Sequence, residues 1–547
     1  MFKCFFLCIY TLVFLFPFNV NAQQISASSF TYTLPVLRDQ EINVIKRYDF
    51  ISAENKDNQS IELDLKLDEW ASSLIAEFTL YKSYGDTNLI KGNNQSNYEK
   101  ITTFPASKGL NHLKVNLDIK KGINSVFLCV KLNSFKTLLQ PFEIKYDRLI
   151  LNGKKIKLKE SNISRHRLAI AVRRHKQDGI HTSRIPGIIT AKDGALVAVY
   201  DARYESSRDL QGHMDIAVSR SLDKGLTWLP YTVALDMKTY GGLAEKFNGV
   251  SDANVLIDDK NGDIYIAGLW MYGVIDETGV WYPGEKNGKE IWNHQWKTKG
   301  SQPGFGLKQT AQFLLVKSTD NGKTWSAPIN LTKMCKVPEW WLWAPAPGHG
   351  ITLRDGTLVI PTQGRNQKGE PFSNITFSKD GGKTWHTSSP ALNESTTECM
   401  AVELEDGSIM LNMRSNLNVT QKGDKNGRAI AITKDLGKTW TEHPTSHQAL
   451  IEPTCMGSIH KHHFFEKGKR KSILLFCNPD SKYARDHMTI KVSRNDGQTW
   501  TKKVLLDQAK SRGYSCITSI DENTIGILYE SSQADLVFQQ VSLSELL

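Results

Sequence analysis

Alternating apolar and polar residues mark several short segments in the first part of the chain. Residues 61–67 have the sequence Ile-Glu-Leu-Asp-Leu-Lys-Leu, residues 113–117 alternate in the same way, and residues 123–128 add a further apolar run. A period of two is typical of a strand with one buried face. Several short strands with polar turns predict a small β-sandwich-like module over residues 23–165. The sequence leaves open whether this module binds carbohydrate or serves as a plain structural cap.

A different pattern recurs after residue 215. An eight-residue segment begins with Ser or Thr, has Asp third, Gly fifth and Thr seventh, and ends in Trp. Copies occupy residues 221–228, 318–325, 378–385, 433–440 and 493–500, the last with Asn495 in place of Asp. A repeat of roughly 60 residues indicates a propeller or a solenoid.

Each copy lies between strand-like apolar runs, such as residues 216–218 and 313–316. Glycine supplies the positive φ that a tight hairpin turn requires, and the Asp carboxylate can accept hydrogen bonds from backbone and hydroxyl groups within the turn. The closing Trp is then expected to pack beneath the strands. Most of the 13 Trp residues of the chain are therefore explained structurally, without sugar binding.

Length and charge narrow the class of protein only a little. A chain of 547 residues is too long for one ordinary core, so two domains or one large repeat fold are expected. The net charge of +11 suits an acidic partner. Lys and Arg are distributed along the chain rather than clustered, and either a nucleic acid or an anionic sugar would fit the charge, so the charge alone does not identify the partner.

The first residues predict the compartment. Residues 1–22 combine a basic start, an apolar run and small residues before Gln23, which is typical of a cleavable secretory signal. The protein is therefore expected to be secreted or periplasmic, and no later stretch predicts a membrane span. Six cysteines follow the signal without a close pair, which argues against a zinc site and favours buried free thiols. No metal or cofactor is expected.

The repeated segment resembles the Asp-box of the sialidase family, and the resemblance covers roughly residues 168–547. It implies an all-β fold, with a six-bladed β-propeller over residues 166–547 behind the smaller module. It also implies an exo-alpha-sialidase that removes terminal sialic acid from glycoproteins, glycolipids or oligosaccharides with retention of configuration. Asp-boxes also occur in other secreted propellers, so the reaction depends on the site residues.

A sialoside carries a carboxylate on its anomeric carbon, which sets the chemical requirements. Planar guanidinium groups bind a carboxylate in a bidentate manner. A carboxylate nucleophile would be repelled by the substrate's own charge, so a neutral nucleophile such as Tyr is better suited, and sialidases are the known tyrosine exception among glycosidases. Because the ordinary pKa of Tyr is near 10, the phenol needs an adjacent base. The leaving oxygen needs a general acid.

The resemblance assigns three arginines to the carboxylate clamp. Arg184 lies in the Arg-Ile-Pro motif, Arg414 ends a strand-like run, and Arg485 precedes the fifth repeat. Two further residues are similar to those that contact the sugar O4 hydroxyl, Arg203 and Asp252.

The resemblance also assigns the catalytic groups. Tyr514 matches the nucleophile, Glu398 the base that activates it, and Asp209 the general acid. Glu403 is a competing base in the same strand, whereas Asp201 is expected to be structural. Residues 345–350, Pro-Ala-Pro-Gly-His-Gly, have no assigned role.

Two other functions remain open on this fold. A trans-sialidase, including an intramolecular one that forms an anhydro product, would use the same residues and differ in the acceptor. A non-catalytic sialic-acid-binding lectin should have lost the equivalents of Tyr514 or Asp209, and this chain has both.

Overall fold

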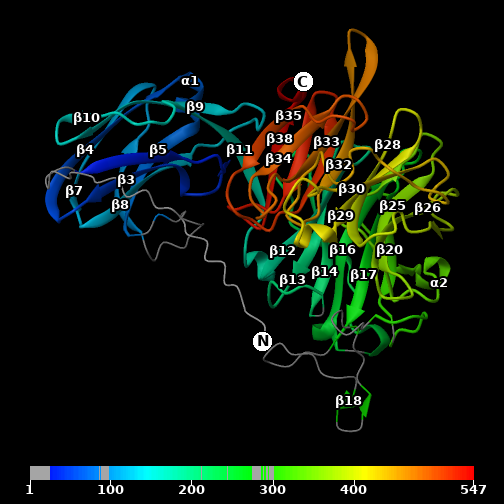
Figure 1. The fold of residues 1–547 in the computed structure, drawn as a ribbon. Helices are drawn as coiled ribbons and strands as arrows, with labels where there is room; N and C mark the ends of the chain where they lie inside the picture. The colour runs from blue at the N-terminus through cyan, green and yellow to red at the C-terminus, as the bar shows by residue number, and fades with distance from the viewer. Residues whose placement is uncertain are drawn as a thin grey trace, which may run out of the picture.

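The computed structural model describes residues 25–547 except 86, 88–97, 211, 243, 274–284, 287–288, 291–293, 295–300 and 309. The predicted signal, residues 1–22, lies outside the described residues. Strands dominate the fold, as the alternating patterns predict, and the chain forms a smaller module beside a larger body (Figure 1). Among the described residues, no helix has the length and hydropathy needed to cross a bilayer.

The smaller module consists of two antiparallel sheets that share one core. The first contains β1 (Ser26–Thr31), β3 (Asn43–Ser52), β8 (Gly122–Leu132), β5 (Ile75–Tyr84) and β6 (Glu99–Pro105). The second contains β7 (Gly109–Ile119), β4 (Lys56–Leu67), β9 (Phe142–Leu151), β10 (Lys154–Ile156) and the first half of β11 (Ile163–Arg173), and the short helix α1 (Glu69–Leu74) precedes β5. In β7 the burial alternates strictly, with Leu113, Val115 and Leu117 facing the core. The period of two therefore places the apolar face as predicted.

The larger body is a β-propeller of four-stranded antiparallel units, so the all-β propeller prediction is confirmed. The first unit contains β12 (Thr182–Thr190), β13 (Leu196–Arg203), β14 (Met214–Ser221) and β15 (Thr232–Leu235), and the second contains β16 (Asn248–Ile257), β17 (Ile264–Tyr272), β20 (Gln312–Ser318) and β21 (Ile329–Asn330). The third contains β22 (Leu342–Pro345), β25 (Leu358–Arg365), β26 (Pro371–Ser378) and β27 (His386–Thr387), and the fourth contains β28 (Thr396–Glu403), β29 (Ile409–Ser415), β30 (Ala429–Thr433) and β31 (Thr441–Glu442). The fifth contains β32 (Ser458–Glu466), β33 (Lys469–Pro479), β34 (Met488–Ser493) and β35 (Lys502–Asp507), and the last contains β36 (Ser515–Asp521), β37 (Thr524–Tyr529) and β38 (Leu536–Ser542) with the second half of β11. Around the centre β12 contacts β16 and β36, and β32 contacts β28 and β36. These five first strands are called inner strands below.

Several short elements complete the fold. The short strand β23 (Gly348–His349) pairs in parallel with β16 of the second unit, and β24 (Ile351–Thr352) pairs with β25 of the third. A separate hairpin pairs β18 (Glu285–Lys286) with β19 (Lys289–Glu290). The helices are α2 (Thr332–Cys335) and α3 (Leu543–Leu546), and 3-10 turns span Gln177–Gly179, Tyr240–Gly242, Glu245–Phe247 and Asn416–Val419.

Each repeated segment forms the turn between the third and fourth strands of its unit. In the first copy, Ser221 Oγ donates to Asp223 Oδ1 at 2.8 Å, and Thr227 Oγ1 donates to Asp223 Oδ2 at 2.6 Å. The fifth copy keeps this closed turn with an amide, because Asn495 Oδ1 accepts from the Thr499 backbone N–H at 3.0 Å. The repeat is thus a structural turn, as its composition indicates.

The strand β11 joins the two parts of the molecule. Residues 163–166 pair with β9 of the module, and residues 170–173 pair with β38 of the propeller. The predicted boundary between residues 165 and 166 falls inside this strand. The adjacent β2 (Pro35–Leu37) pairs with β11 in parallel, and Leu37 packs with Ala169 in a core that includes Ile517 and Val537 of the last unit. The module is therefore continuous with the closure of the propeller.

We expect Leu37→Ala to destabilise the whole chain, because Leu37 is fully buried at this junction. Loss of a buried Leu side chain costs about 2–5 kcal/mol of unfolding free energy. Urea unfolding measures the effect, with Leu110→Ala, half-exposed on β7, as the control. Equal values for the two variants would show that the junction contributes no stability.

Candidate active site

Three inner strands carry a register shift toward the same end of the propeller. The shifts lie between Arg184 and Gly187 in β12, between Ser251 and Asn254 in β16, and between Thr396 and Cys399 in β28. A bulge of this kind redirects a side chain that would otherwise alternate across the sheet. Arg184, Asp252 and Glu398 each lie within one of these shifts.

The backbone is strained at two of the shifts. Ile185, a β-branched residue, has φ of 59°, and Asp252 also has φ of 59°. Left-handed backbone is costly for such residues and persists only where the surrounding packing enforces it. Ile185 is buried in the core, and its N–H donates to Glu530 Oε1 at 3.1 Å. The fold thus holds the backbone next to Arg184 in an unfavourable conformation.

Tyr514, directly before the inner strand β36, is the residue on which the predicted arginines converge. The guanidinium carbons of Arg184 and Arg485 lie 5.3 Å and 5.6 Å from the centre of its ring. Arg414 Nη1 lies 3.3 Å from the Tyr514 hydroxyl, which donates a hydrogen bond to Glu398 Oε1. Arg184, Arg414, Arg485, Tyr514 and Glu398 therefore occupy one site, although they come from different strands and loops.

Two buried carboxylates balance the positive charge of this site. Glu398 Oε2 accepts from Arg414 Nη1 at 2.7 Å. Glu530 accepts from Arg184 through both of its oxygens, at 2.7 Å and 3.2 Å, and also from the backbone N–H of Tyr514 at 3.0 Å. Burial alone would raise the pKa of Glu530, but Arg184 and the backbone donors outweigh it and hold the pKa below its ordinary value. Glu530 thus fixes one arginine and the start of the tyrosine strand together.

The phenol of Tyr514 is held in its protonated form. Burial and the nearby charge of Glu398 raise its pKa well above 10.0, against the opposing effect of Arg414 and Arg485. A protonated phenol is a weak nucleophile unless a base accepts its proton as it attacks. Glu398 Oε1, which already accepts the hydroxyl hydrogen bond, is placed to do so.

Arg485 and Arg414 differ in the hydrogen bonds that their guanidinium groups donate. Among the described residues, Arg485 donates to two backbone carbonyls, to Arg512 O at 3.0 Å and to Thr454 O at 3.3 Å, and to no side chain. The buried Nε of Arg414 has no hydrogen-bond partner in the part of the chain that the structure describes. Burying an unpaired charged donor is costly, so this N–H is suited to an anionic ligand.

The remaining predicted residues form a second group joined by Arg203. This fully buried arginine pairs with Asp201 Oδ2 at 2.8 Å and with Asp209 Oδ1 at 3.0 Å. Asp201 is completely buried and also accepts from Ser251 Oγ at 2.7 Å, which fits its predicted structural role. Asp209 has a side chain that is 76% exposed, so it is accessible to a leaving group.

Asp252 completes this group. Gln363 Nε2 donates to its Oδ2 at 3.2 Å. Burial raises its pKa well above the ordinary value, and the charges of Asp209, Glu398 and Asp201 raise it further, while Arg203 opposes them. A raised pKa favours the protonated carboxyl group over the carboxylate, and the protonated group can form a hydrogen bond with a sugar hydroxyl.

Glu403, the competing candidate base, lies elsewhere. It is at the far end of β28, where its Oε1 pairs with Arg354 Nε at 3.2 Å. The geometry therefore favours Glu398 over Glu403 as the group beside Tyr514. No set of three His, Cys, Asp or Glu side chains is placed to hold a metal ion among the described residues.

Sequence reasoning missed Glu530 and Gln363. Glu530 follows β37 in an apolar context, and an acidic residue after Ile-Leu-Tyr could have been marked as a buried carboxylate that needs a partner. Gln363 lies in an ordinary strand, β25, and nothing in its neighbourhood singles it out.

Comparisons with known proteins agree on one family. Residues 185–511 match the family described as the BNR repeat-like domain. A sialidase of Bacteroides fragilis is 40% identical over 439 residues, 80% of this chain and 76% of that protein. A sialidase of Clostridium perfringens is 29% identical over 367 residues, 64% of this chain and 86% of that protein. Among solved structures, a Hadza microbial sialidase is similar with a TM-score of 0.83 and 34% identity, covering 95% of this chain and 100% of that chain.

We expect Glu530→Gln to reduce both stability and kcat/KM, because it leaves the buried Arg184 without a counter-charge. Breaking a buried ion pair from one side costs about 3–5 kcal/mol. Chemical unfolding and steady-state kinetics measure the two effects. Glu69→Gln, which removes an exposed pair with Lys108, is the control and should change stability by less than about 1 kcal/mol. If the two variants behave alike, Glu530 does not hold the site.

Proposed function

Because this chain belongs to the sialidase family and releases terminal sialic acid from sialylated glycans, we propose that it does so with retention of configuration, through a covalent tyrosyl intermediate. The observation that carries the proposal is the convergence of Arg184, Arg414 and Arg485 on one protonated phenol that donates to Glu398. Three guanidinium groups suit a substrate with a carboxylate on the reacting carbon.

In the first displacement, the three arginines bind the sugar carboxylate and stabilise the positive charge that develops on the ring. Tyr514 Oη attacks the anomeric carbon as its proton passes to Glu398. The bond to the departing glycan breaks, and Asp209 gives that oxygen a proton. Arg203 and Asp252 contact the O4 hydroxyl of the sugar, and Arg203 also pairs with Asp209.

In the second displacement, Asp209 takes a proton from water, and the water oxygen replaces Tyr514 at the anomeric carbon. Glu398 returns its proton to the phenol, so the site is restored. Two inversions give overall retention.

Terminal sialic acid on glycoproteins, glycolipids and oligosaccharides is the proposed substrate. The leech intramolecular trans-sialidase is similar in fold, with a TM-score of 0.54 and 16% identity, covering 90% of this chain and 94% of that one. That likeness shows the fold alone, and hydrolysis is the reaction that the relatives at higher identity favour. The predicted secretory signal at residues 1–22 supports export from the cytoplasm, so we propose that the protein is secreted or periplasmic.

We expect the wild-type protein to convert 3′- and 6′-sialyllactose to free sialic acid whose first-formed anomer is α, as proton NMR can follow. Tyr514→Phe should lower turnover on the order of 10³-fold or more, because no oxygen remains to attack. Tyr200→Phe removes a buried hydroxyl that bonds Ser219 within the propeller and is the matched control. A first-formed β anomer, or normal turnover by Tyr514→Phe, would rule out the mechanism. An anhydro product would instead assign intramolecular transfer.

We expect Asp209→Ala to affect substrates unequally. Sialyllactose has a poor leaving group that needs a proton, so its hydrolysis should fall by about 10²–10⁴-fold. A nitrophenyl sialoside leaves without protonation and should lose much less in its first displacement. Pre-steady-state release of nitrophenol measures that step, and an equal loss on both substrates would contradict the assignment of Asp209 as general acid.

A further inference from the structure

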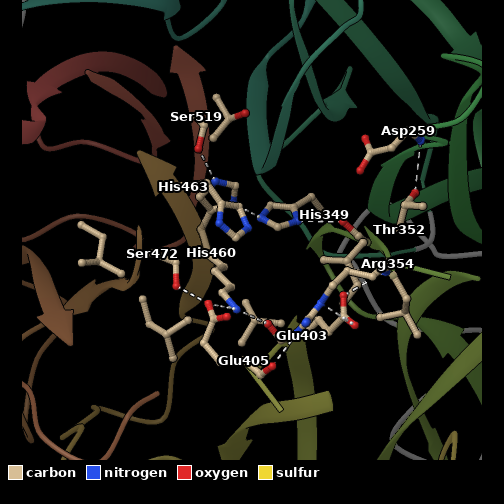
Figure 2. Close-up of a pocket in the computed structure, with 18 of the residues that line it drawn as sticks. Asp259, His349, Thr352, Arg354, Glu403, Glu405, His460, His463, Ser472 and Ser519 are labelled. Carbon is tan, nitrogen blue, oxygen red and sulfur yellow. Dashed lines mark hydrogen bonds and ion pairs between the residues drawn. The ribbon is translucent and has the colours of Figure 1, made fainter. Parts of the chain in front are cut away.

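A hollow lies at the opposite end of the inner strands from the arginine–tyrosine site. It has a volume of about 890 Å³ and is lined by Thr190 of β12, Ile257 of β16, Glu403 of β28 and Ser519 of β36, among others (Figure 2). Tyr514 and Ser519 are five residues apart, and at about 3.3 Å per residue the hollow lies roughly 17 Å from the catalytic groups. Its volume is in the range of small-ligand sites, about 300–1,000 Å³.

The floor of the hollow is polar. His460 Nδ1 and His349 Nε2 face each other at 3.3 Å, and His460 Nε2 lies 2.8 Å from Ser519 Oγ (Figure 2). His349 comes from residues 345–350, the segment to which the sequence assigns no role. Gly348 is required there, because it has φ of 110° and a Cβ would lie 2.8 Å from Met400 Sδ. This segment carries an imidazole to the centre of the propeller, where the catalytic mechanism does not use it.

Two of the four carboxylates that line the hollow are already paired. Glu403 pairs with Arg354 at 3.2 Å, and Glu405 pairs with Lys461 at 2.8 Å and accepts from Ser472 Oγ at 2.6 Å. These pairs are shown together in Figure 2. Glu403 and Glu405 therefore contribute little net negative charge to this wall. Asp259 and Asp496 also line the hollow and are in no ion pair within the described residues, but six Lys and Arg residues line it against these four carboxylates.

The basic hairpin, residues 460–471, forms the other wall. It joins β32 to β33 and contains five Lys and Arg residues but only one Glu. Lys467 and Gly468 both have positive φ at its turn, which gives a tight and regular hairpin. Although basic residues occur along the whole chain, this hairpin concentrates them beside a cavity.

Two cations of the basic hairpin are available to a ligand. Arg470 and Lys471 both line the hollow, but as successive residues of β33 they project from opposite faces of the strand, and Arg470 shares the face of Ser472, which reaches Glu405. Within the described part of the chain no carboxylate lies at ion-pair distance from either cation, so a saccharide that follows the edge of the hairpin can contact both. Desolvation and the positive charges of Arg470 and Lys461 lower the pKa of the neighbouring His463 to about 4. The wall therefore carries a positive potential.

We propose that this hollow and the basic hairpin form a second carbohydrate-binding site, specific for an anionic saccharide. Its sulfate or carboxylate groups pair with Arg470 and Lys471, since guanidinium and ammonium groups bind such oxyanions. Its hydroxyls reach the polar floor at His460 and Ser519. A hollow of this volume suits a discrete chain rather than a flat lipid surface. The site would hold the enzyme on a polyanionic glycan with the catalytic site facing away from it.

Isothermal titration with a heparin-derived tetrasaccharide, at physiological salt, tests the proposal on the full chain. Arg470→Gln combined with Lys471→Gln should weaken binding at least tenfold. Lys154→Gln combined with Lys155→Gln makes the same charge change on another exposed hairpin, β9–β10, and should change the Kd less than twofold. Both double variants should hydrolyse a small fluorogenic sialoside at the wild-type rate, which separates this proposal from the catalytic one.

The fully desulfated tetrasaccharide gives a test that needs no variant, and the wild-type protein should bind it at least tenfold more weakly. Equal weakening in the two double variants would show that overall charge attracts the ligand. Failure of the wild-type protein to bind the sulfated tetrasaccharide would overturn the proposal. So would binding to phosphatidylserine vesicles without binding to the saccharide, since that result identifies a membrane surface.

Discussion

The site depends on holding three like charges around one uncharged phenol. Guanidinium groups at this separation repel one another and lose hydration on burial, so they can converge only with counter-charges built into the fold. Glu530 supplies one to Arg184 and Glu398 supplies one to Arg414, while Arg485 is held by backbone carbonyls. One further anion fits, and a sialoside carries it on the carbon where the reaction occurs.

Both counter-charges perform a second task. Glu530 accepts hydrogen bonds from the backbone N–H groups of Ile185 and Tyr514, so one carboxylate fixes Arg184 and Tyr514 relative to each other. Glu398 accepts one hydrogen bond from the Tyr514 hydroxyl and another from Arg414. The group that balances the charge of Arg414 is therefore also the group that we propose as the base for Tyr514. This sharing keeps the site small enough for a single sugar.

The propeller gives this site a rigid frame and two different ends. Register shifts in β12, β16 and β28 redirect side chains at one end, where the catalytic groups lie. At the other end the same strands run on regularly, and the hollow above His349 and His460 opens there. The strand β11 closes the ring and continues into the smaller module, so the module shares the packing that holds the propeller together.

The sequence alone determined the class of fold and the chemistry. Alternation with a period of two predicted the strands, and the repeated turn, with its Asp, Gly, Thr and Trp, predicted a propeller or a solenoid, because these patterns are local constraints on φ and on hydrogen bonding. The family resemblance then selected the propeller. Residue types and family motifs then led to Arg184, Arg414, Arg485, Tyr514 and Glu398, which the structure brings together. The family resemblance favoured Glu398 over Glu403, and the tertiary structure gave the physical reason, since five residues along one strand lead to opposite ends of the propeller. The tertiary structure alone showed that Glu530 pairs with Arg184, that β11 belongs to both parts of the molecule, and that His349 faces His460. Each of these contacts depends on which distant strands become neighbours, and a local sequence pattern does not specify that.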